Sequence, residues 1–175
     1  MKAAPHVLDT HRLTLRRLEP ADAGFIFELT NDPDWLQHIG DRGIRSLDDA
    51  HRYITDGPCA MYARHGFGLY LVALQDTGTP VGLCGLLKRD WLDDVDIGFA
   101  LLPAFRGRGY ALEAAVATLE CGRTTVGLQR IAAIVSPGNA DSLQLLGRLG
   151  LRFERMVVPP NEASPLCLYA TPPPG

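Results

Sequence analysis

The sequence lacks three patterns that would each define a class of protein: a Lys-Ser or Lys-Thr dipeptide, a Cys-x-x-Cys pair and a long apolar run. Without the first there is no P-loop, because that motif ends in lysine followed by serine or threonine. Without the second there is no spacing typical of zinc or thiol redox sites. Without the third there is no transmembrane helix. The N-terminus also lacks the apolar core of a signal peptide, so we expect a reduced, cytoplasmic protein.

The sequence also lacks a large excess of positive or negative charge. The formal net charge is −3, so we expect no basic surface that would attract nucleic acid or an anionic membrane. The histidines show no metal-binding spacing, and we expect no metal. The chain has 175 residues, 46% hydrophobic and 21% charged, which suits one globular domain. With no repeat or linker, we expect a single domain over residues 1–175, ordered over about 8–171, with a flexible tail at 172–175.

Apolar periodicity and turn residues predict an α/β fold. Helices are expected to begin near Pro20, Ser46, Gly107 and Asn139. Strands are expected over residues 12–16, 67–75, 80–88, 94–102, 130–136, 156–158 and 165–171. With a second helix before residue 67, the order is β-α-α-β-β-β-α-β-α-β-β. The stretch around Trp35 is expected to be irregular.

Residues 94–112 carry the most informative pattern. An apolar strand ends before Pro103, and the turn from Arg106 to Gly109 leads into a helix. A helix start exposes unpaired N–H groups and the positive end of the helix dipole. Glycines in this turn clear side chains from those groups, and its arginines add charged donors. The turn therefore predicts a pyrophosphate site. A loop with solvated arginines is the alternative that this segment alone leaves open.

A second segment, from Asn139 to Gly150, adds independent information. Asn139 and Ser142 stand at a helix start, apolar residues follow at a spacing of three, and a glycine ends the helix. A dinucleotide fingerprint does not explain the first segment, because Leu112 stands where the third glycine would be needed. The two segments occur in order and are separated by an expected strand.

Together these segments resemble the GNAT superfamily of N-acetyltransferases. Arg106-Gly-Arg-Gly-Tyr-Ala111 matches its R/Q-x-x-G-x-G/A signature, and Asn139 with Ser142 resembles its second motif. The overall pattern looks like the RimJ/RimL-type branch and is strongest over 94–153. The resemblance implies a mixed, mostly antiparallel sheet that is splayed between its fourth and fifth strands. It also implies acetyl-CoA as co-substrate and transfer of the acetyl group to a primary amine.

The acceptor implied by the resemblance is a protein N-terminus or a small-molecule amine, which attacks the thioester of acetyl-CoA directly in a ternary complex. We expect the enzyme to be a monomer or a homodimer. A splayed sheet would leave backbone groups of Leu101 and Leu102 unpaired for the pantetheine amides. Backbone N–H groups near Ala100 or Leu101 would polarise the thioester carbonyl. The expected cofactor contacts are Ala100, Leu101, Leu102, Arg106, Gly107, Arg108, Gly109, Tyr110, Ala111, Asn139 and Ser142.

Two side chains are candidates for proton transfer. Asp96 occupies the position where GNAT members often carry a glutamate that acts on the amine directly or through water; a solvated edge carboxylate is the other role open to it. The tyrosine that many GNAT enzymes use as general acid is replaced by Leu146. Ser142 is the remaining hydroxyl for that step, and helix capping is its alternative role.

Two other functions remain open at this stage. One is a GNAT module that binds acyl-CoA with little or no catalysis, acting as a sensor or partner, which the missing tyrosine favours. The other is an enzyme that acts on nucleotide phosphates through the Arg/Gly turn. The absence of a P-loop lysine followed by serine or threonine argues against that second function.

Overall fold

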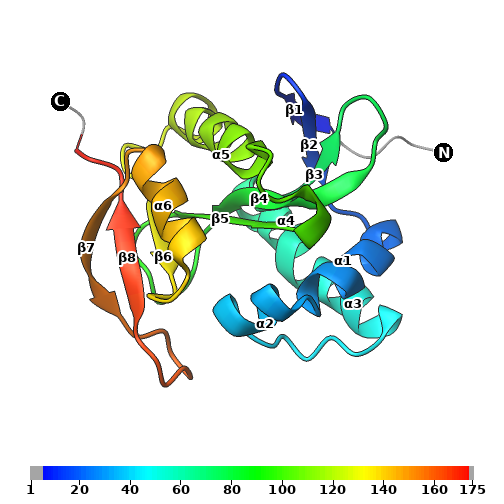
Figure 1. Ribbon diagram of the computed structural model, residues 1–175, viewed down its shortest axis with the longest axis horizontal. Coiled ribbons are helices and arrows are strands. Elements are labelled where there is room, and N and C mark those ends of the chain that lie inside the picture. The colour runs from blue at the N-terminus through cyan, green and yellow to red at the C-terminus, as the bar shows by residue number, and fades with distance from the viewer. Residues whose placement is uncertain (1–5, 174–175) are drawn as a thin grey trace.

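Eight strands form one mixed sheet in the computed structural model, which describes residues 6–173. Their spatial order is β1-β2-β3-β4-β5-β6-β8-β7 (Figure 1). The strands are β1 (His6–Asp9), β2 (Leu13–Arg17), β3 (Leu69–Leu74), β4 (Pro80–Leu87), β5 (Asp96–Leu101), β6 (Ala132–Val135), β7 (Arg152–Val157) and β8 (Leu166–Ala170). The expectations for residues 1–5 and for the end of the tail, Pro174 and Gly175, lie outside the described residues.

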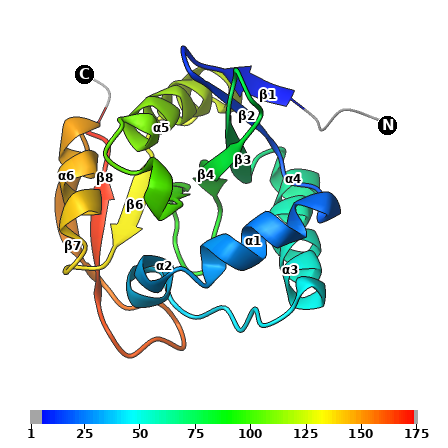
Figure 2. The same cartoon turned by 45° about the vertical axis from the view of Figure 1, so that its right-hand side comes forward.

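Helices cover both faces of the sheet. On one face, α1 (Ala23–Thr30) and α3 (Leu47–Ile54) pack against a core that includes Leu71 and Leu83. On the other, α5 (Tyr110–Cys121) and α6 (Ala140–Arg148) share a second core with Val72 and Val81. Figure 2 shows α5 and α6 on the side opposite α1 and α3. Within the described residues, no helix is long and apolar enough to cross a bilayer.

The sheet opens between β5 and β6, the only parallel pair of strands among residues 6–173. Their register contains one pair of residues, Asp96 with Ala132, whereas β4 and β5 are paired continuously from Gly82–Leu101 to Leu87–Asp96. Because β6 then continues with β8 instead of β5, the carboxyl end of β5 loses its neighbour on one side. This confirms the splay that was expected between the fourth and fifth strands of the sequence-based order.

Three local expectations are corrected. The chain starts with a hairpin, β1 and β2, so the sheet has eight strands instead of seven. The stretch around Trp35 is helix α2 (Pro33–His38), because the Asp32 carboxylate caps its start by accepting from the Asp34 N–H at 3.2 Å. The last hairpin begins at Arg152 and is longer than expected.

The remaining helical segment behaves as its sequence indicates. The Ser46 hydroxyl accepts from the Asp49 N–H at the start of α3. A π-helical turn over Thr55–Cys59 contains Pro58 and separates α3 from α4 (Ala60–His65). Gly66, at φ 79°, ends α4 in the left-handed conformation that glycine adopts most readily.

Candidate active site

Two cavities meet where the sheet opens. One, of about 520 Å³, lies against the amino end of β5 and is bounded by α2, the β4–β5 loop and the β7–β8 loop. The other, of about 420 Å³, lies between α2, the turn before α5 and the start of α6. They share seven lining residues: Trp35, His38, Ile39, Phe99, Ala100, Asn139 and Ser142. We call these shared residues the neck, and the two spaces the acceptor cavity and the cofactor cavity.

The expected anion turn lines the cofactor cavity. Gly107 and Gly109 have φ values of 76° and 82°, which a side chain would strain, and Gly109 directly precedes α5. A Cβ on Gly109 would lie 3.3 Å from the Arg12 guanidinium. Tyr110 and Ala111 line the cavity too, whereas the exposed Arg108 is not among its lining residues. A helix start that is cleared of side chains and faces a cavity fits a phosphate group.

Arg12, which the sequence analysis did not single out, holds this turn in place. Its guanidinium donates to the Arg108 carbonyl at 2.9 Å and to Glu113 in the first turn of α5 at 2.8 Å, and it lies 4.5 Å from the Tyr110 ring centroid. Burial raises the pKa of Glu113, but hydrogen bonds from Thr10 and Arg12 outweigh it and lower that pKa overall. The β1–β2 turn therefore supports the anion turn through an ionised carboxylate.

Arg106 is hydrogen-bonded within the fold and links the turn before α5, the end of β5 and the start of α2. Its guanidinium donates to Asp32 at 2.8 Å and to the Leu101 carbonyl at 2.8 and 3.1 Å, and it also pairs with Asp34. The Asp32 side chain is only 8% exposed, so this part of the network is largely screened from solvent. The arginine expected to bind phosphate thus ties the cofactor turn and the end of β5 to the start of α2.

The backbone hydrogen bonds of β5 correct the expectation that Leu101 and Leu102 both leave backbone groups unpaired. The Leu102 N–H donates to Val81 on β4 at 2.9 Å, and the Val95 carbonyl accepts from Ala132 on β6 at 2.9 Å. Since successive residues of a strand direct their backbone groups to opposite sides, Phe99 and Leu101 face the opening, and Ala100 faces Leu83 on β4.

The prediction that Leu102 leaves its backbone unpaired is therefore wrong for its N–H group. The Leu101 carbonyl is also engaged, because it accepts a hydrogen bond from Arg106. The Leu101 N–H still faces the opening as expected. Phe99, which the sequence analysis missed, is the second residue whose backbone faces it. Once one hydrogen-bonded pair of β5 is known, the alternation of backbone direction along the strand identifies Phe99 as a residue that faces the opening.

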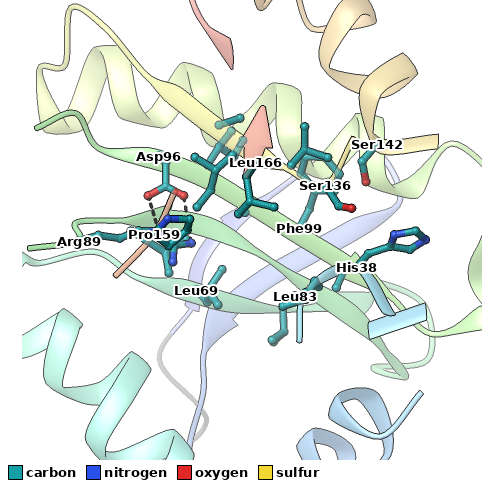
Figure 3. A pocket seen from close by; sticks show the side chains of 18 of the residues that line it. His38, Leu69, Leu83, Arg89, Asp96, Phe99, Ser136, Ser142, Pro159 and Leu166 are labelled. Carbon is teal, nitrogen blue, oxygen red and sulfur yellow. Dashed lines mark hydrogen bonds and ion pairs between the residues drawn. The ribbon is translucent and has the colours of Figure 1, made fainter. Parts of the chain in front are cut away.

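Asn139 and Ser142 lie together at the neck. The Asn139 side-chain oxygen accepts from the Ser142 N–H at 3.2 Å and caps α6, and both residues line both cavities. Leu146, at the position of the usual tyrosine, is buried and contributes to the main core. Ser142 is the hydroxyl that α6 presents to both cavities (Figure 3).

Asp96 lines the acceptor cavity, far from the neck. It is 1% exposed, and Arg89 donates to its two oxygens at 2.9 and 3.2 Å (Figure 3). Burial raises the pKa of Asp96, and the Arg89 charge offsets this only in part. Asp96 is therefore not the solvated edge carboxylate considered above. Phe99 lies three positions further along the strand, about 10 Å away at the usual rise per residue.

Helix α2 supplies two of the neck residues, Trp35 and His38. The Trp35 indole nitrogen and the His38 Nδ1 are buried and lack a hydrogen-bond partner within residues 6–173. An unpaired buried polar atom is costly, by about 1–3 kcal/mol. Among the same residues, no group of three or more His, Cys, Asp or Glu side chains is placed to bind a metal.

Comparisons with known proteins agree with this geometry. The uncharacterized N-acetyltransferase YnaD of Bacillus subtilis is 28% identical over 147 residues, covering 84% of this chain and 83% of YnaD. The crystal structure of an acetyltransferase from Agrobacterium tumefaciens superposes with a TM-score of 0.80 at 28% identity, covering 97% of this chain and 95% of that one. RimL, a ribosomal L7/L12 alpha-N-protein acetyltransferase solved with coenzyme A, shares the fold, with a TM-score of 0.79 at 16% identity over 94% of this chain and 96% of RimL.

The family assignment rests on the length of the matched region. Residues 12–152 match the family described as acetyltransferase (GNAT) domain. That match includes β2 to β6, the anion turn, α6 and the neck, so it covers both segments on which the resemblance was based. The chain belongs to the GNAT family of acetyltransferases.

Proposed function

We propose that this chain, as a single acetyltransferase domain, transfers the acetyl group of acetyl-CoA to a primary amine by direct attack in a ternary complex. The observation that carries the proposal is the neck: two cavities of about 520 and 420 Å³ share one set of walls. Two substrates that occupied the cavities would meet between Phe99 and Ser142. Such preorganised proximity is a large part of how enzymes accelerate bimolecular reactions.

The residues of the cofactor cavity suit coenzyme A. The backbone around Gly107 and Gly109 would receive the pyrophosphate, and the N–H groups of Phe99 and Leu101 would receive the pantetheine arm. When bound, acetyl-CoA supplies a thioester carbonyl that is open to attack by an amine. One of the two β5 N–H groups would then stabilise the charge that develops on that oxygen.

Two proton transfers accompany the reaction. The amine must lose a proton, because an ammonium group has no free electron pair. Asp96 is too far from Phe99 for direct contact, so we assign it the role of accepting that proton through water in the acceptor cavity. Ser142 lies at the neck, and we assign it the protonation of the leaving thiolate.

The alternative, a module that binds acyl-CoA with little catalysis, is based on Leu146, which stands where many GNAT enzymes have the tyrosine that acts as general acid. Ser142 offers the hydroxyl that the missing tyrosine would have supplied, so the departure at Leu146 does not by itself favour that alternative. The acceptor class left open here is the one expected from the sequence, a protein N-terminus or a small-molecule amine. RimL, which acts on the N-terminus of a ribosomal protein, shows that this fold accommodates the first kind.

The proposal is tested by incubating the protein with acetyl-CoA and a panel of amines and following the release of free thiol. The panel should contain N-terminal peptides, polyamines, aminoglycosides and amino acids. We expect amine-dependent thiol release, with the acetylated amine identified by mass spectrometry. Coenzyme A binding without turnover of any amine would favour the binding module.

A further inference from the structure

The end of the acceptor cavity that lies away from the neck is basic. Arg42, Arg89 and Tyr53 line it, from the loop after α2, the β4–β5 loop and the end of α3. Trp91 and the β7–β8 loop close the same cavity. Three separate segments thus bring two guanidinium groups and a phenol to one region of a cavity whose other end is the neck.

The carboxylate of this region is already engaged. Asp96 accepts two hydrogen bonds from Arg89, through the guanidinium Nε and one terminal nitrogen. The second terminal nitrogen of Arg89 has no hydrogen-bond acceptor among residues 6–173, so it remains available to a ligand. Lys88 holds the loop that carries Arg89, because its ammonium donates to the carbonyls of Arg89 and Leu92 at 2.7 and 2.6 Å.

Arg42 and Tyr53 add donors that are not used within the fold. In the part of the chain that the structure describes, Arg42 forms no ion pair, whereas the nearby Arg45 pairs with Asp41. Burial raises the pKa of the Tyr53 phenol, while the charges of Arg42 and Arg89 partly counteract this. The phenol therefore stays protonated at neutral pH, and both arginines lie near enough to act on it.

We propose that this basic end, formed by Arg42, Arg89 and Tyr53, binds a carboxylate carried by the acceptor amine. The inference rests on the proposed function and narrows its acceptor class. Asp96, which Arg89 holds, lies three strand positions from Phe99 at the neck, so an acceptor with its amine at the neck and its carboxylate at Arg89 has an extended chain of roughly 10 Å between the two groups. The acceptor is thus an ω-amino acid, or a peptide N-terminus followed by an acidic side chain.

Polycationic acceptors fit this cavity poorly. A polyamine with one nitrogen at the neck would bring its second ammonium group toward two guanidinium groups. Asp96 cannot compensate for that second charge, since it is buried and paired with Arg89. Glu162 also lines the cavity, but it is an exposed residue of the β7–β8 loop.

The test compares three acceptors with a chain of six carbon atoms: 6-aminohexanoate, hexylamine and 1,6-diaminohexane. The end remote from the reacting amine is a carboxylate, a methyl group or an ammonium group, respectively. We expect kcat/KM for thiol release to fall in that order, with roughly a tenfold to hundredfold advantage of the carboxylate over the neutral chain. Binding is measured independently by titration calorimetry with free coenzyme A present, where 6-aminohexanoate should bind more tightly than hexylamine.

Two variants locate the effect. Arg42→Gln should bring the ratio of kcat/KM for 6-aminohexanoate over hexylamine close to one, while the hexylamine rate changes little. Arg45→Gln is the matched control, since Arg45 lies three residues away, is exposed and does not line the cavity. It should keep the wild-type ratio.

A preference for 1,6-diaminohexane, or an unchanged ratio in a folded Arg42→Gln protein, would overturn the carboxylate site. Either result would leave the proposed acetyltransferase function standing, because thiol would still be released with an amine. If no member of the series is acetylated, calorimetry alone tests the carboxylate site. Tighter binding of 6-aminohexanoate than of hexylamine would support the site, and equal or weaker binding would overturn it.

Discussion

The two cavities are built in different ways. In the cofactor cavity, the anion turn depends on the backbone around Gly107 and Gly109, and the segments 106–112 and 139–148 supply over half of the lining residues. The other lining residues come from α1, from α2 and the residues that flank it, and from β5. The acceptor cavity is formed by side chains from α2, α3, the β4–β5 loop, β6 and the β7–β8 loop. A site made of backbone needs glycines and a helix start at fixed spacing, whereas a site made of scattered side chains follows no local pattern. This difference explains why the sequence indicates the cofactor but not the acceptor.

The largest effect is expected where the cofactor cavity depends on the absence of a side chain. Gly109→Glu would place bulk and negative charge in the anion turn and should weaken coenzyme A binding at least about 100-fold, or about 2.7 kcal/mol. Gly78→Glu is the matched control, because Gly78 also has positive φ, 74°, but lies in the β3–β4 turn with open space around it. Near-normal coenzyme A binding by a folded Gly109→Glu protein would remove the turn from the cofactor site.

A smaller effect is expected at the neck. Ser142→Ala should lower kcat by about 10- to 100-fold with little change in the KM for acetyl-CoA, if Ser142 protonates the leaving thiolate. Asn139→Ala should behave differently: it removes the cap of α6, costs about 1 kcal/mol in the free energy of unfolding and raises that KM. Steady-state kinetics and thermal unfolding of both variants separate the two roles. An unchanged kcat in Ser142→Ala would leave Ser142 with a capping role alone.

The next prediction concerns Asp96 in the acceptor cavity and the pH dependence of kcat/KM. Asp96→Asn should lower kcat/KM by about tenfold, since only the ionised carboxylate accepts a proton. Because burial raises the pKa of Asp96, the wild-type rate should fall as pH decreases through a value above the usual aspartate range, and this acidic limb should be lost in Asp96→Asn. Asp93→Asn, at an exposed position of the β4–β5 loop that precedes Asp96, serves as the control. A wild-type rate for Asp96→Asn across pH 6–9 would show that water alone carries the proton.

The smallest effect is expected at Arg106, which ties the start of α2 to the end of β5. Arg106→Gln would release α2 from the end of β5, so we expect the KM for the acceptor to rise several-fold and coenzyme A affinity to change less. Arg108→Gln, two residues away in an exposed position, should show the opposite pattern, because a charge near the bound pyrophosphate would be lost. Calorimetry with coenzyme A and acceptor kinetics measure both. Equal loss of coenzyme A affinity in the two variants would mean that Arg106 is a phosphate ligand after all.

The sequence predicted most of the fold because its helix starts and strand pattern are local signals. Ser46 and Asn139 mark helix starts by their own chemistry, and the structure has those starts where expected. The hairpin strand β1 was missed because four residues carry too little alternation to be distinguished from a loop. Helix α2 was missed because its cap, Asp32, also belongs to a stretch that ends the preceding helix.

The candidate site was predictable where it follows a local sequence pattern. Gly107, Gly109 and Asn139 were expected at the cofactor cavity from their residue types and spacing, and they line it. The partners of Arg106 and Asp96 were not predictable, since Asp32 is 74 positions away from Arg106 and Arg89 belongs to a loop without a pattern. Arg42 and Tyr53 were missed for the same reason.

The central claim is that two substrates meet at the neck and react directly. Within residues 6–173, none of the four cysteines lines either cavity, so no thiol is placed to carry the acetyl group. The most direct test is the initial rate of thiol release with acetyl-CoA and the amine varied together. Direct attack predicts intersecting double-reciprocal lines and no thiol burst in the absence of amine. Parallel lines with a burst of thiol from acetyl-CoA alone would indicate an acetyl-enzyme and contradict the account.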